Sequence, residues 1–326
     1  EARIKESATQ LPLSFQYEPE DSNTERPQLD DIQGKQPVDS AYPSIRTYAE
    51  AYREGWTTPL EVARKFLAAK ENSEQLTPPL RAYIALDRED VLAQAEASTQ
   101  RFQSGKPISI FDGVPVTIKD EMDQVPYPTT IGTSFYGGAA VEEDATVVAR
   151  LREMGALLLG KANMYEIGIN PEGLNPNHGR CCNPWNLAHD TGGSSSGPAA
   201  AVAAGFSPVS IGADGGGSIR IPAAFCGLIG LKATFGRVSE HGAAPTNWSV
   251  AHLGPIGACV EDVVLAYTAI AGPDPLDPNS LHQPPARIEG WNNPSMEGIR
   301  LGVYSEHFNH ADPEIVKANQ EMLDKL

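Results

Sequence analysis

The 326-residue sequence predicts an α/β fold in which a mixed β-sheet is flanked by helices on both faces. From residue 106 onward, short apolar runs typical of buried strands alternate with longer segments of helical periodicity. Glycines close several of these helical segments, as expected where one element gives way to the next. A hydrophobic content of 40% is sufficient for the core that such a fold needs.

Two helices are expected ahead of this core, within residues 45–105. The first begins at residues 58–61 (Thr-Pro-Leu-Glu), which form a capping box with proline at the first helical position. The second follows Asp87 and ends at Gly105. We expect these helices to form an N-terminal cap on the core.

The core itself, residues 106–326, is expected to alternate strands and helices. The predicted strands are residues 114–118, 156–159, 208–213 and 299–304, and the predicted helices are residues 146–154, 197–205, 260–270 and 312–326. The last helix has no Gly or Asn to end it, so we expect the natural polypeptide to continue.

Composition restricts the classes of function. The net charge of −17, from 42 acidic and 25 basic residues, repels phosphate backbones and argues against a nucleic-acid partner. No apolar run reaches the roughly 18 residues of a membrane span, and no signal peptide is evident. The four cysteines have neither zinc-type spacing nor a disulfide framework, which indicates a cytoplasmic protein. Residues 1–44, rich in Glu, Asp, Gln and Pro, are expected to be a weakly ordered acidic leader.

Two glycine- and serine-rich segments, residues 191–197 and 214–222, lie among apolar elements, unlike a flexible linker. The second leads from a predicted buried strand into an apolar helix. Glycines there allow close backbone approach and direct N–H groups at one point, which can bind a phosphate or an oxyanion. A phosphate loop would place lysine after the glycines, whereas Ser218 follows them here. The segment therefore predicts an oxyanion hole beside a serine nucleophile.

A serine nucleophile needs a base to accept its proton. No histidine lies in or beside either segment, and all seven histidines lie in polar or loop-like stretches. Lys119 is the better candidate because it ends the apolar strand predicted at residues 114–118. Burial is expected to lower the pKa of Lys119 from the ordinary value of about 10.4, so that its neutral amine can act as the base.

Two other motifs come close to known sites. Residues 193–197 match the nucleophile elbow of α/β-hydrolases with Ser195 as nucleophile, but that elbow follows a strand, and residues 183–190 are polar and contain proline. Residues 155–161 approximate a phosphate loop, with Ala162 in place of the required Ser or Thr. A helix end followed by a strand accounts better for this second motif.

Together these segments resemble the amidase signature. Residues 192–197 (Gly-Gly-Ser-Ser-Ser-Gly) open it, and residues 113–120 resemble the family's lysine strand. Matches at the expected offsets are Gly212, Asp214, Gly216, Ser218, Arg220 and Pro222. The resemblance covers most of residues 45–326. Within the family, Gly-Gly-Gly-Ser at residues 215–218 is most similar to plant-type fatty acid amide hydrolases, because most members have threonine at Gly215.

The resemblance implies a triad in which Ser218 is the nucleophile, Lys119 the base, and Ser194 a bridging serine held by a cis peptide. It implies an oxyanion hole made by the backbone N–H groups of Gly215, Gly216, Gly217 and Ser218. It also implies that Ser195 is a supporting hydrogen-bond partner, and that Asp214 and Arg220 hold the loop as a buried pair.

The implied activity is hydrolysis of a carboxylic amide, with a long-chain N-acyl amine as the expected substrate, through an acyl-enzyme and without metal or cofactor. The family's C-terminal part, which closes the sheet and helps to form the acyl pocket, is expected to be absent from this chain. A homodimer and a peripheral membrane contact are further expectations. Two alternatives stay open: a glutamine-hydrolysing subunit of an amidotransferase, and a non-catalytic amidase-like fragment.

Overall fold

The computed structural model describes residues 42–245, 247–284, 286, 288, 291–292 and 295–326. Most of the predicted leader, residues 1–41, lies outside the described residues. The chain divides into two compact units, the first ending at Ile288 and the second spanning Glu289–Leu326, and each is described by itself.

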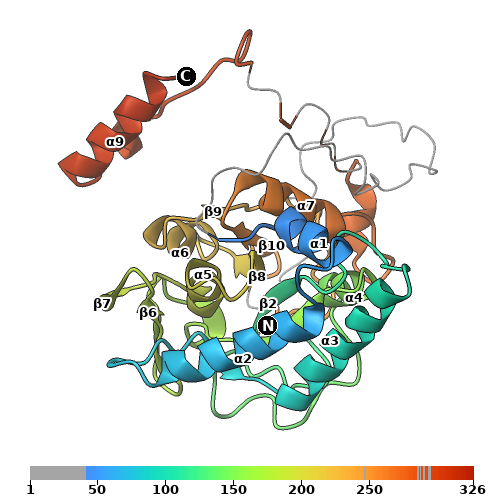
Figure 1. Ribbon diagram of the computed structural model, residues 1–326. Helices are drawn as coiled ribbons and strands as arrows, with labels where there is room; N and C mark the ends of the chain where they lie inside the picture. Colours follow the sequence, from blue (N-terminus) through green and yellow to red (C-terminus); the bar gives the residue numbers. More distant parts are fainter. Residues whose placement is uncertain (1–41, 246, 285, 287, 289–290, 293–294) are drawn as a thin grey trace. The chain divides into compact units, whose positions relative to one another are not determined.

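A six-stranded mixed sheet with the order β1-β3-β2-β8-β10-β9 forms the centre of the first unit (Figure 1). Strand β2 runs parallel to β3 and β8, whereas β1, β10 and β9 run antiparallel to their neighbours. The strands are β1 (Tyr83–Ala85), β2 (Pro115–Lys119), β3 (Leu157–Ala162), β8 (Val209–Asp214), β9 (Ile229–Gly230) and β10 (His252–Gly257). The mixed sheet is confirmed, and the strands predicted at 114–118, 156–159 and 208–213 are β2, β3 and β8.

Two short ribbons lie outside this sheet. Strand β4 (Leu174–Asn175) pairs with β5 (Gly179–Arg180), and β6 (Cys182–Asn183) pairs with β7 (Asn186–Asp190).

The three parallel strands are buried along their whole length, as expected for strands covered on both faces. Ile118 of β2 pairs with Lys161 of β3 and with Ile211 of β8. This register brings the carboxyl ends of the three strands to one edge, where the ligands of open α/β sheets are commonly bound. Lys119 ends β2 at this edge, and Asp214 ends β8 there.

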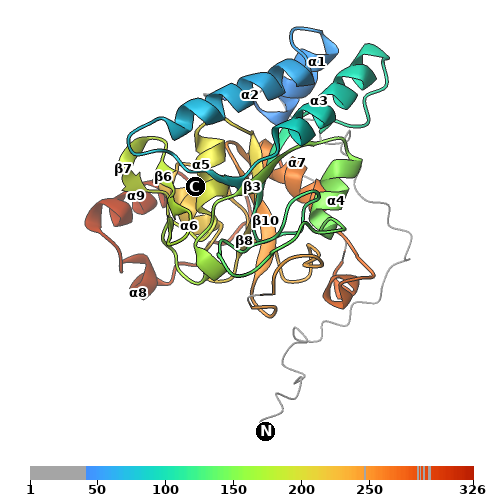
Figure 2. The same ribbon diagram turned by 90° about the horizontal axis from the view of Figure 1, so that it is seen from below.

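Helices cover both faces of the sheet, as predicted. Ser210 of β8 donates its hydroxyl to the Pro198 carbonyl of α5, whereas Gly257 of β10 faces Val263 of α7. Figures 1 and 2 show the strands between α5 on one side and α4 and α7 on the other. The helices are α1 (Ile45–Arg53), α2 (Pro59–Glu74), α3 (Arg88–Gln103), α4 (Thr146–Glu153), α5 (Ser196–Ala203), α6 (Arg220–Phe225) and α7 (Val260–Ile270). Short 3₁₀ turns occupy Glu166–Gly168 and Pro278–His282.

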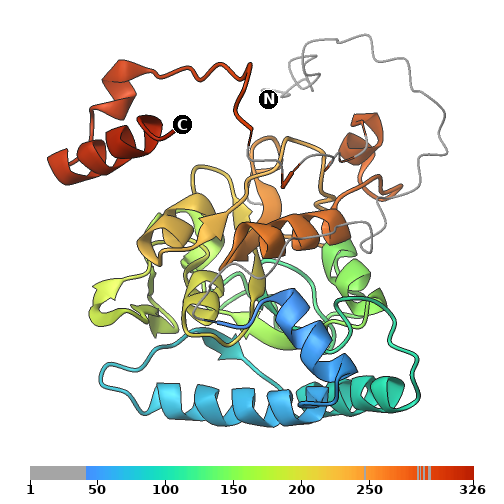
Figure 3. The same cartoon turned by 45° about the horizontal axis from the view of Figure 1, so that its top comes forward.

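Local capping determines where the long N-terminal helices start. The Thr58 hydroxyl accepts from the Glu61 N–H and the Glu61 carboxylate accepts from the Thr58 N–H, which completes the predicted capping box of α2. Asp87 caps α3 in the same way by accepting two backbone N–H groups. Helices α2 and α3 pack against each other, and Figure 3 shows both along the same side of the first unit.

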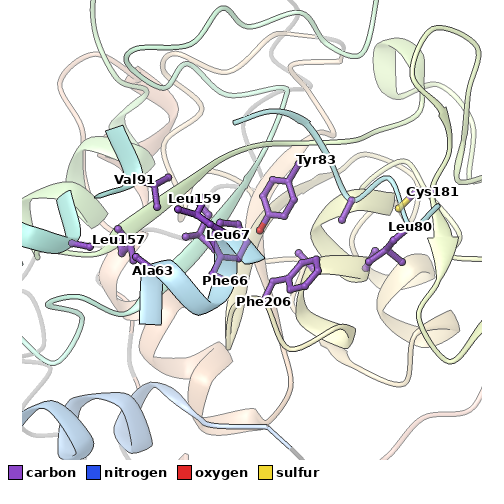
Figure 4. Close-up of a cluster of buried hydrophobic side chains, with 14 residues drawn as sticks. Ala63, Phe66, Leu67, Leu80, Tyr83, Val91, Leu157, Leu159, Cys181 and Phe206 are labelled. Atoms are coloured by element: carbon purple, nitrogen blue, oxygen red, sulfur yellow. The ribbon is translucent and has the colours of Figure 1, made fainter. Parts of the chain in front are cut away.

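These helices share one hydrophobic core with the sheet (Figure 4). The ring of Phe66 on α2 meets the rings of Tyr83 and Phe206 edge-on, with centroids 5.6 and 5.7 Å apart. Each such pair contributes about 0.5–1.5 kcal/mol beyond the area that it buries. Leu157 and Leu159 of β3 complete the contact, so residues 45–105 contribute to the same core as the sheet.

The second unit contains α8 (Ser305–Phe308) and α9 (Pro313–Leu323), which confirms the helix predicted after Asp312. The strand predicted at residues 299–304 is wrong. A strand needs a neighbour to accept and donate its backbone hydrogen bonds, and residues 299–304 pair with no other described segment. Among the described residues, no helix is both long and apolar enough to cross a bilayer.

Gly197 allows α5 to approach the sheet closely. A Cβ at this position would lie 2.3 Å from the Ala82 carbonyl oxygen and 2.4 Å from the Asn163 nitrogen, both of which are backbone atoms. We therefore expect Gly197→Ala to lower the free energy of unfolding by about 1–3 kcal/mol, measured by urea denaturation. Gly138→Ala is the matched control because nothing lies within 4 Å of its Cβ position. Equal losses in the two variants would contradict the close approach.

Candidate active site

Lys119 occupies the end of β2 with only 1% of its surface exposed. Its Nζ lies 2.9 Å from Ser194 Oγ, 3.4 Å from the Ala213 carbonyl oxygen and 2.6 Å from Glu121 Oε2. Two of the three residues expected to form a triad, Lys119 and Ser194, are therefore in direct contact. The two residues are 75 positions apart in the sequence. The segment of Ser194 is held beside Lys119 because the Ser195 hydroxyl donates to the Ala213 carbonyl of β8, the strand next to β2.

Ser194 precedes α5, and the Gly193–Ser194 peptide bond is cis, as the resemblance implied. The Ser194 carbonyl accepts the Tyr165 N–H at 3.1 Å, which ties it to the segment after β3. Gly168 lies over the hydroxyl: a Cβ at this glycine would be 3.4 Å from Ser194 Oγ. The Ser194 side chain is thus enclosed between Lys119 and the Glu166–Gly168 turn.

Ser218 is partly exposed in the turn that joins β8 to α6. Its carbonyl accepts the Ser195 N–H at 3.1 Å, so its backbone lies against the residue that follows Ser194. The two serine segments predicted to act together are therefore adjacent in the fold.

Asp214 shapes the loop that carries Ser218. Its buried carboxylate accepts the N–H groups of Gly217 (2.7 Å) and Ile219 (3.1 Å), and it accepts two hydrogen bonds of 3.0 Å from the Arg220 guanidinium. Burial acts to raise the pKa of Asp214, but Arg220 and the backbone donors outweigh it and lower the pKa to about 2. The expected ion pair is present, with one correction: the Arg220 side chain is 53% exposed, so only Asp214 is buried. Its supporting role in the site stays a prediction.

One of the four N–H groups expected to form the oxyanion hole, those of Gly215, Gly216, Gly217 and Ser218, is already used within the loop. The Gly217 N–H is directed at Asp214, where it holds the loop. Gly217 has a φ of +131°, which strongly favours glycine. The backbone N–H groups of Gly215, Gly216 and Ser218 are the remaining candidates for binding an oxyanion.

Ser195 has no exposed surface, and its hydroxyl donates to the Ala213 carbonyl at 3.2 Å. A strand does precede it, contrary to expectation, because residues 186–190 form β7. That strand pairs with β6 outside the central sheet, so the nucleophile elbow, which tops a strand of the main sheet, is not formed. Ser195 instead fixes the end of β8.

Two charged residues near Lys119 were missed in the sequence. Glu121 is buried beside the amine, and Lys161 of β3 is fully buried with Nζ 3.4 Å from Asp120 Oδ1. Burial lowers the pKa of Lys161, and Asp120 opposes that effect. The signal was present, because Lys161 lies inside a largely apolar run and Glu121 comes two residues after another such run ends at Lys119. Lys161 lies within β3, which confirms a helix end and strand in place of a phosphate loop.

The histidines need a smaller correction. His252 lies in strand β10, opposite Asp214, and not in a loop. His189 lies in the polar stretch expected for it, which forms β7. The His252 Nδ1 contacts Lys232 Nζ at 2.8 Å and the Val250 carbonyl at 2.6 Å. His252 is therefore part of the hydrogen-bond network at this edge of the sheet.

A cavity of about 200 Å³ lies beside the base. Its lining includes Glu121 and Ala213, both of which contact Lys119 Nζ, together with Glu240, Trp248 and apolar side chains. Burial, with repulsion from Asp277, raises the pKa of Glu240 to about 8. The cavity is smaller than the roughly 300–1,000 Å³ of sites that enclose a whole ligand.

Comparison with known proteins agrees with this geometry. A family model described as Amidase matches residues 62–326. The chain belongs to the amidase signature family. Fatty acid amide hydrolase of Oryza sativa subsp. indica is 44% identical over 291 residues, which cover 87% of this chain and 48% of that protein.

Two other members of the family are also similar. A glutamyl-tRNA(Gln) amidotransferase subunit of a Cyanothece species is 38% identical over 259 residues, covering 79% of this chain and 54% of that protein. The native peptide amidase of Stenotrophomonas maltophilia has a TM-score of 0.72 and 32% identity, covering 77% of this chain and 52% of that one. The chain thus spans about half the length of these relatives.

The Asp214 carboxylate should make stability depend on pH. Because its pKa is about 2 in the folded protein and 3.8 ordinarily, its contribution is complete above pH 4 and is lost as the pH falls to 2. The lost stability is about 2 kcal/mol. Asp214→Asn cannot show this loss, so the gap in free energy of unfolding between wild type and variant should narrow from pH 5 to pH 2 in urea titrations. The same substitution at exposed Asp324 is the control, and a constant gap for Asp214→Asn would contradict the assignment.

Proposed function

We propose that the chain hydrolyses a carboxylic amide, with Ser218 as nucleophile, Ser194 as proton relay and Lys119 as base. The buried contact of 2.9 Å between Lys119 Nζ and Ser194 Oγ carries the proposal. A hydroxyl can accept one proton and donate another, so Ser194 can pass the proton of Ser218 to Lys119. The backbone contact between Ser218 and Ser195 supports the placement of the nucleophile beside this relay.

In the proposed reaction, Ser218 Oγ attacks the amide carbonyl while its proton moves through Ser194 to Lys119. The N–H groups of Gly215, Gly216 and Ser218 stabilise the oxyanion of the tetrahedral intermediate. The proton then returns through Ser194 to the leaving nitrogen, and the amine departs. Water attacks the acyl-enzyme by the same route and releases the acid.

The substrate proposed is a long-chain N-acyl amine, because the rice relative at 44% identity is a fatty acid amide hydrolase. The cavity of about 200 Å³ can enclose only part of such a molecule. A homodimer, a peripheral membrane contact and a cytoplasmic location stay predictions.

Two alternative functions remain. The Cyanothece relative, at 38% identity, favours a subunit that releases ammonia from glutamine for a partner. A non-catalytic role as an amidase-like fragment is the other, since the chain spans about half of its relatives. The first alternative differs from the proposal in its substrate, which is glutamine. The second differs in that the chain catalyses no reaction.

Fluorophosphonate labelling tests the nucleophile. The wild-type chain should react covalently, and Ser218→Ala should abolish labelling because it removes the attacking oxygen while the relay stays intact. Labelling is measured by intact-protein mass spectrometry.

Ser196→Ala is the matched control, because the Ser196 hydroxyl bonds the Asn163 carbonyl and should not react. Labelling that survives Ser218→Ala but disappears in Ser195→Ala would instead support the nucleophile elbow. A wild-type chain that stays unlabelled beside a reactive serine hydrolase would favour the non-catalytic alternative.

A panel of amides tests the substrate. Long-chain N-acyl amines should be hydrolysed with a higher kcat/KM than short acyl amides or glutamine. Each additional buried methylene contributes about 0.8 kcal/mol, or about fourfold in kcat/KM. Amine release is measured for each substrate. Glutamine as the best substrate would support the amidotransferase alternative, and equal rates for all acyl lengths would contradict a lipid amide.

A further inference from the structure

Glu121 is the one carboxylate in the described part of the chain that contacts the amine of Lys119. It follows β2, is 4% exposed, and places Oε2 2.6 Å from Lys119 Nζ. We propose that Glu121 is a positioning residue for the amide hydrolysis proposed above, on which this inference rests. It turns the lone pair of Lys119 toward Ser194, and it stabilises the ammonium ion that Lys119 becomes when it accepts the proton.

The orientation follows from the donors and acceptors around Nζ. A neutral amine has two N–H bonds and one lone pair. Of the three oxygens placed around it, the Glu121 carboxylate and the Ala213 carbonyl can only accept hydrogen bonds. The Ala213 carbonyl accepts one N–H bond, and the carboxylate, in an ion-pair contact without hydrogen-bond geometry, draws the positive N–H side of the amine by its charge. The lone pair is left facing Ser194 Oγ, which is the neighbour with a proton to donate.

The net charge of Lys119 and Glu121 changes when the proton arrives at the amine. Before attack, the pair of neutral Lys119 and ionised Glu121 carries one negative charge. When the proton of Ser194 reaches Nζ and the proton of Ser218 replaces it on Ser194, the pair becomes a contact ion pair with no net charge. Glu121 stays ionised throughout and the proton returns to the leaving nitrogen. An aspartate supports histidine in this way in the Ser-His-Asp triad, where it orients the base and stabilises its cation.

The other charged groups around this pair do not replace Glu121. Asp120 is paired with Lys161, and Asp214 is paired with Arg220. Glu240 shares the cavity lining with Glu121, and its pKa of about 8 leaves it largely protonated at neutral pH. The charge of Glu121 also contributes to the raised pKa of Glu240. The pH profiles with and without Glu121→Gln are therefore compared in a Glu240→Gln background, where a change reports on Glu121.

The decisive variant is Glu121→Gln, which keeps the side-chain shape and removes the charge. We expect kcat to fall by about 10²–10⁴-fold, as when the charged partner of a catalytic base is neutralised, with KM changed by less than about threefold. The rise of the rate with pH should move to lower pH, because the neutral amide no longer holds the proton on Lys119. Glu121→Asp, which restores the charge, should recover part of kcat.

Glu166→Gln is the matched control. The same change from glutamate to glutamine can be made at Glu166, in the turn that encloses Ser194. The Glu166 carboxylate accepts a hydrogen bond from the Asn177 side chain and is not in contact with Lys119. We expect its kcat and pH profile to stay at the wild-type values. Thermal unfolding of each variant shows whether it is folded, and Glu121→Met, which also removes the charge at similar length, replaces Glu121→Gln if the latter is not.

A measurement without substrate separates this inference from the proposed function. The ¹³Cε resonance of Lys119, assigned through Lys119→Arg, should titrate at lower pH in Glu121→Gln than in wild type. An unchanged titration, or a Glu121→Gln enzyme with wild-type kcat and pH profile, would overturn the role of Glu121. If the resonance differs between wild type and Glu121→Gln as expected but the wild-type chain cleaves no amide, the effect of Glu121 on Lys119 stands and the proposed function is overturned.

Discussion

The burial of one amine, that of Lys119, constrains the whole site. An amine removed from water must have its polar bonds satisfied by the protein, because an unpaired buried group costs several kcal/mol. The oxygens that do so come from three separate segments: Ser194 before α5, Ala213 in β8 and Glu121 after β2. The position of β2 beside β8 puts Lys119 near Ala213, and the hydrogen bond from Ser195 to Ala213 holds the segment of Ser194 against them.

Two further carboxylates at this edge of the sheet turn strand ends into shaped loops. Asp120 accepts the N–H of Gly132 and the hydroxyl of Thr130, and so folds the segment after β2 back over the edge. Asp214 folds the segment after β8, which carries Ser218, in a similar way. The first of these segments also includes Glu121, so loop shape and the environment of the base are coupled through neighbouring residues.

The geometry of the site is contained in the first compact unit. All of the residues proposed to act, from Lys119 to Arg220, precede Ile288. The enclosure of a long substrate is a separate matter, since the cavity beside Lys119 is small and the chain spans about half of its relatives.

The sequence by itself determined those elements that depend on a local pattern of apolar, small or capping residues. The apolar runs of β2, β3 and β8, the capping box at Thr58 and the small residues of α5 were each readable because they depend on neighbours along the chain. Lys119 and Ser218 could be named as candidates from their places at the end of an apolar strand and after a run of glycines, whereas Ser194 was implied by the resemblance to the amidase signature.

Only the tertiary structure decided which groups these residues meet. The contact of Glu121 with Lys119, the use of the Gly217 N–H by Asp214 and the burial of Lys161 all depend on strand order and loop path. The same dependence explains the apolar residues at 299–304, which have a strand-like pattern but pair with no described strand. Pattern records how much of a residue is buried, whereas hydrogen bonds and ion pairs require a partner that pattern does not specify.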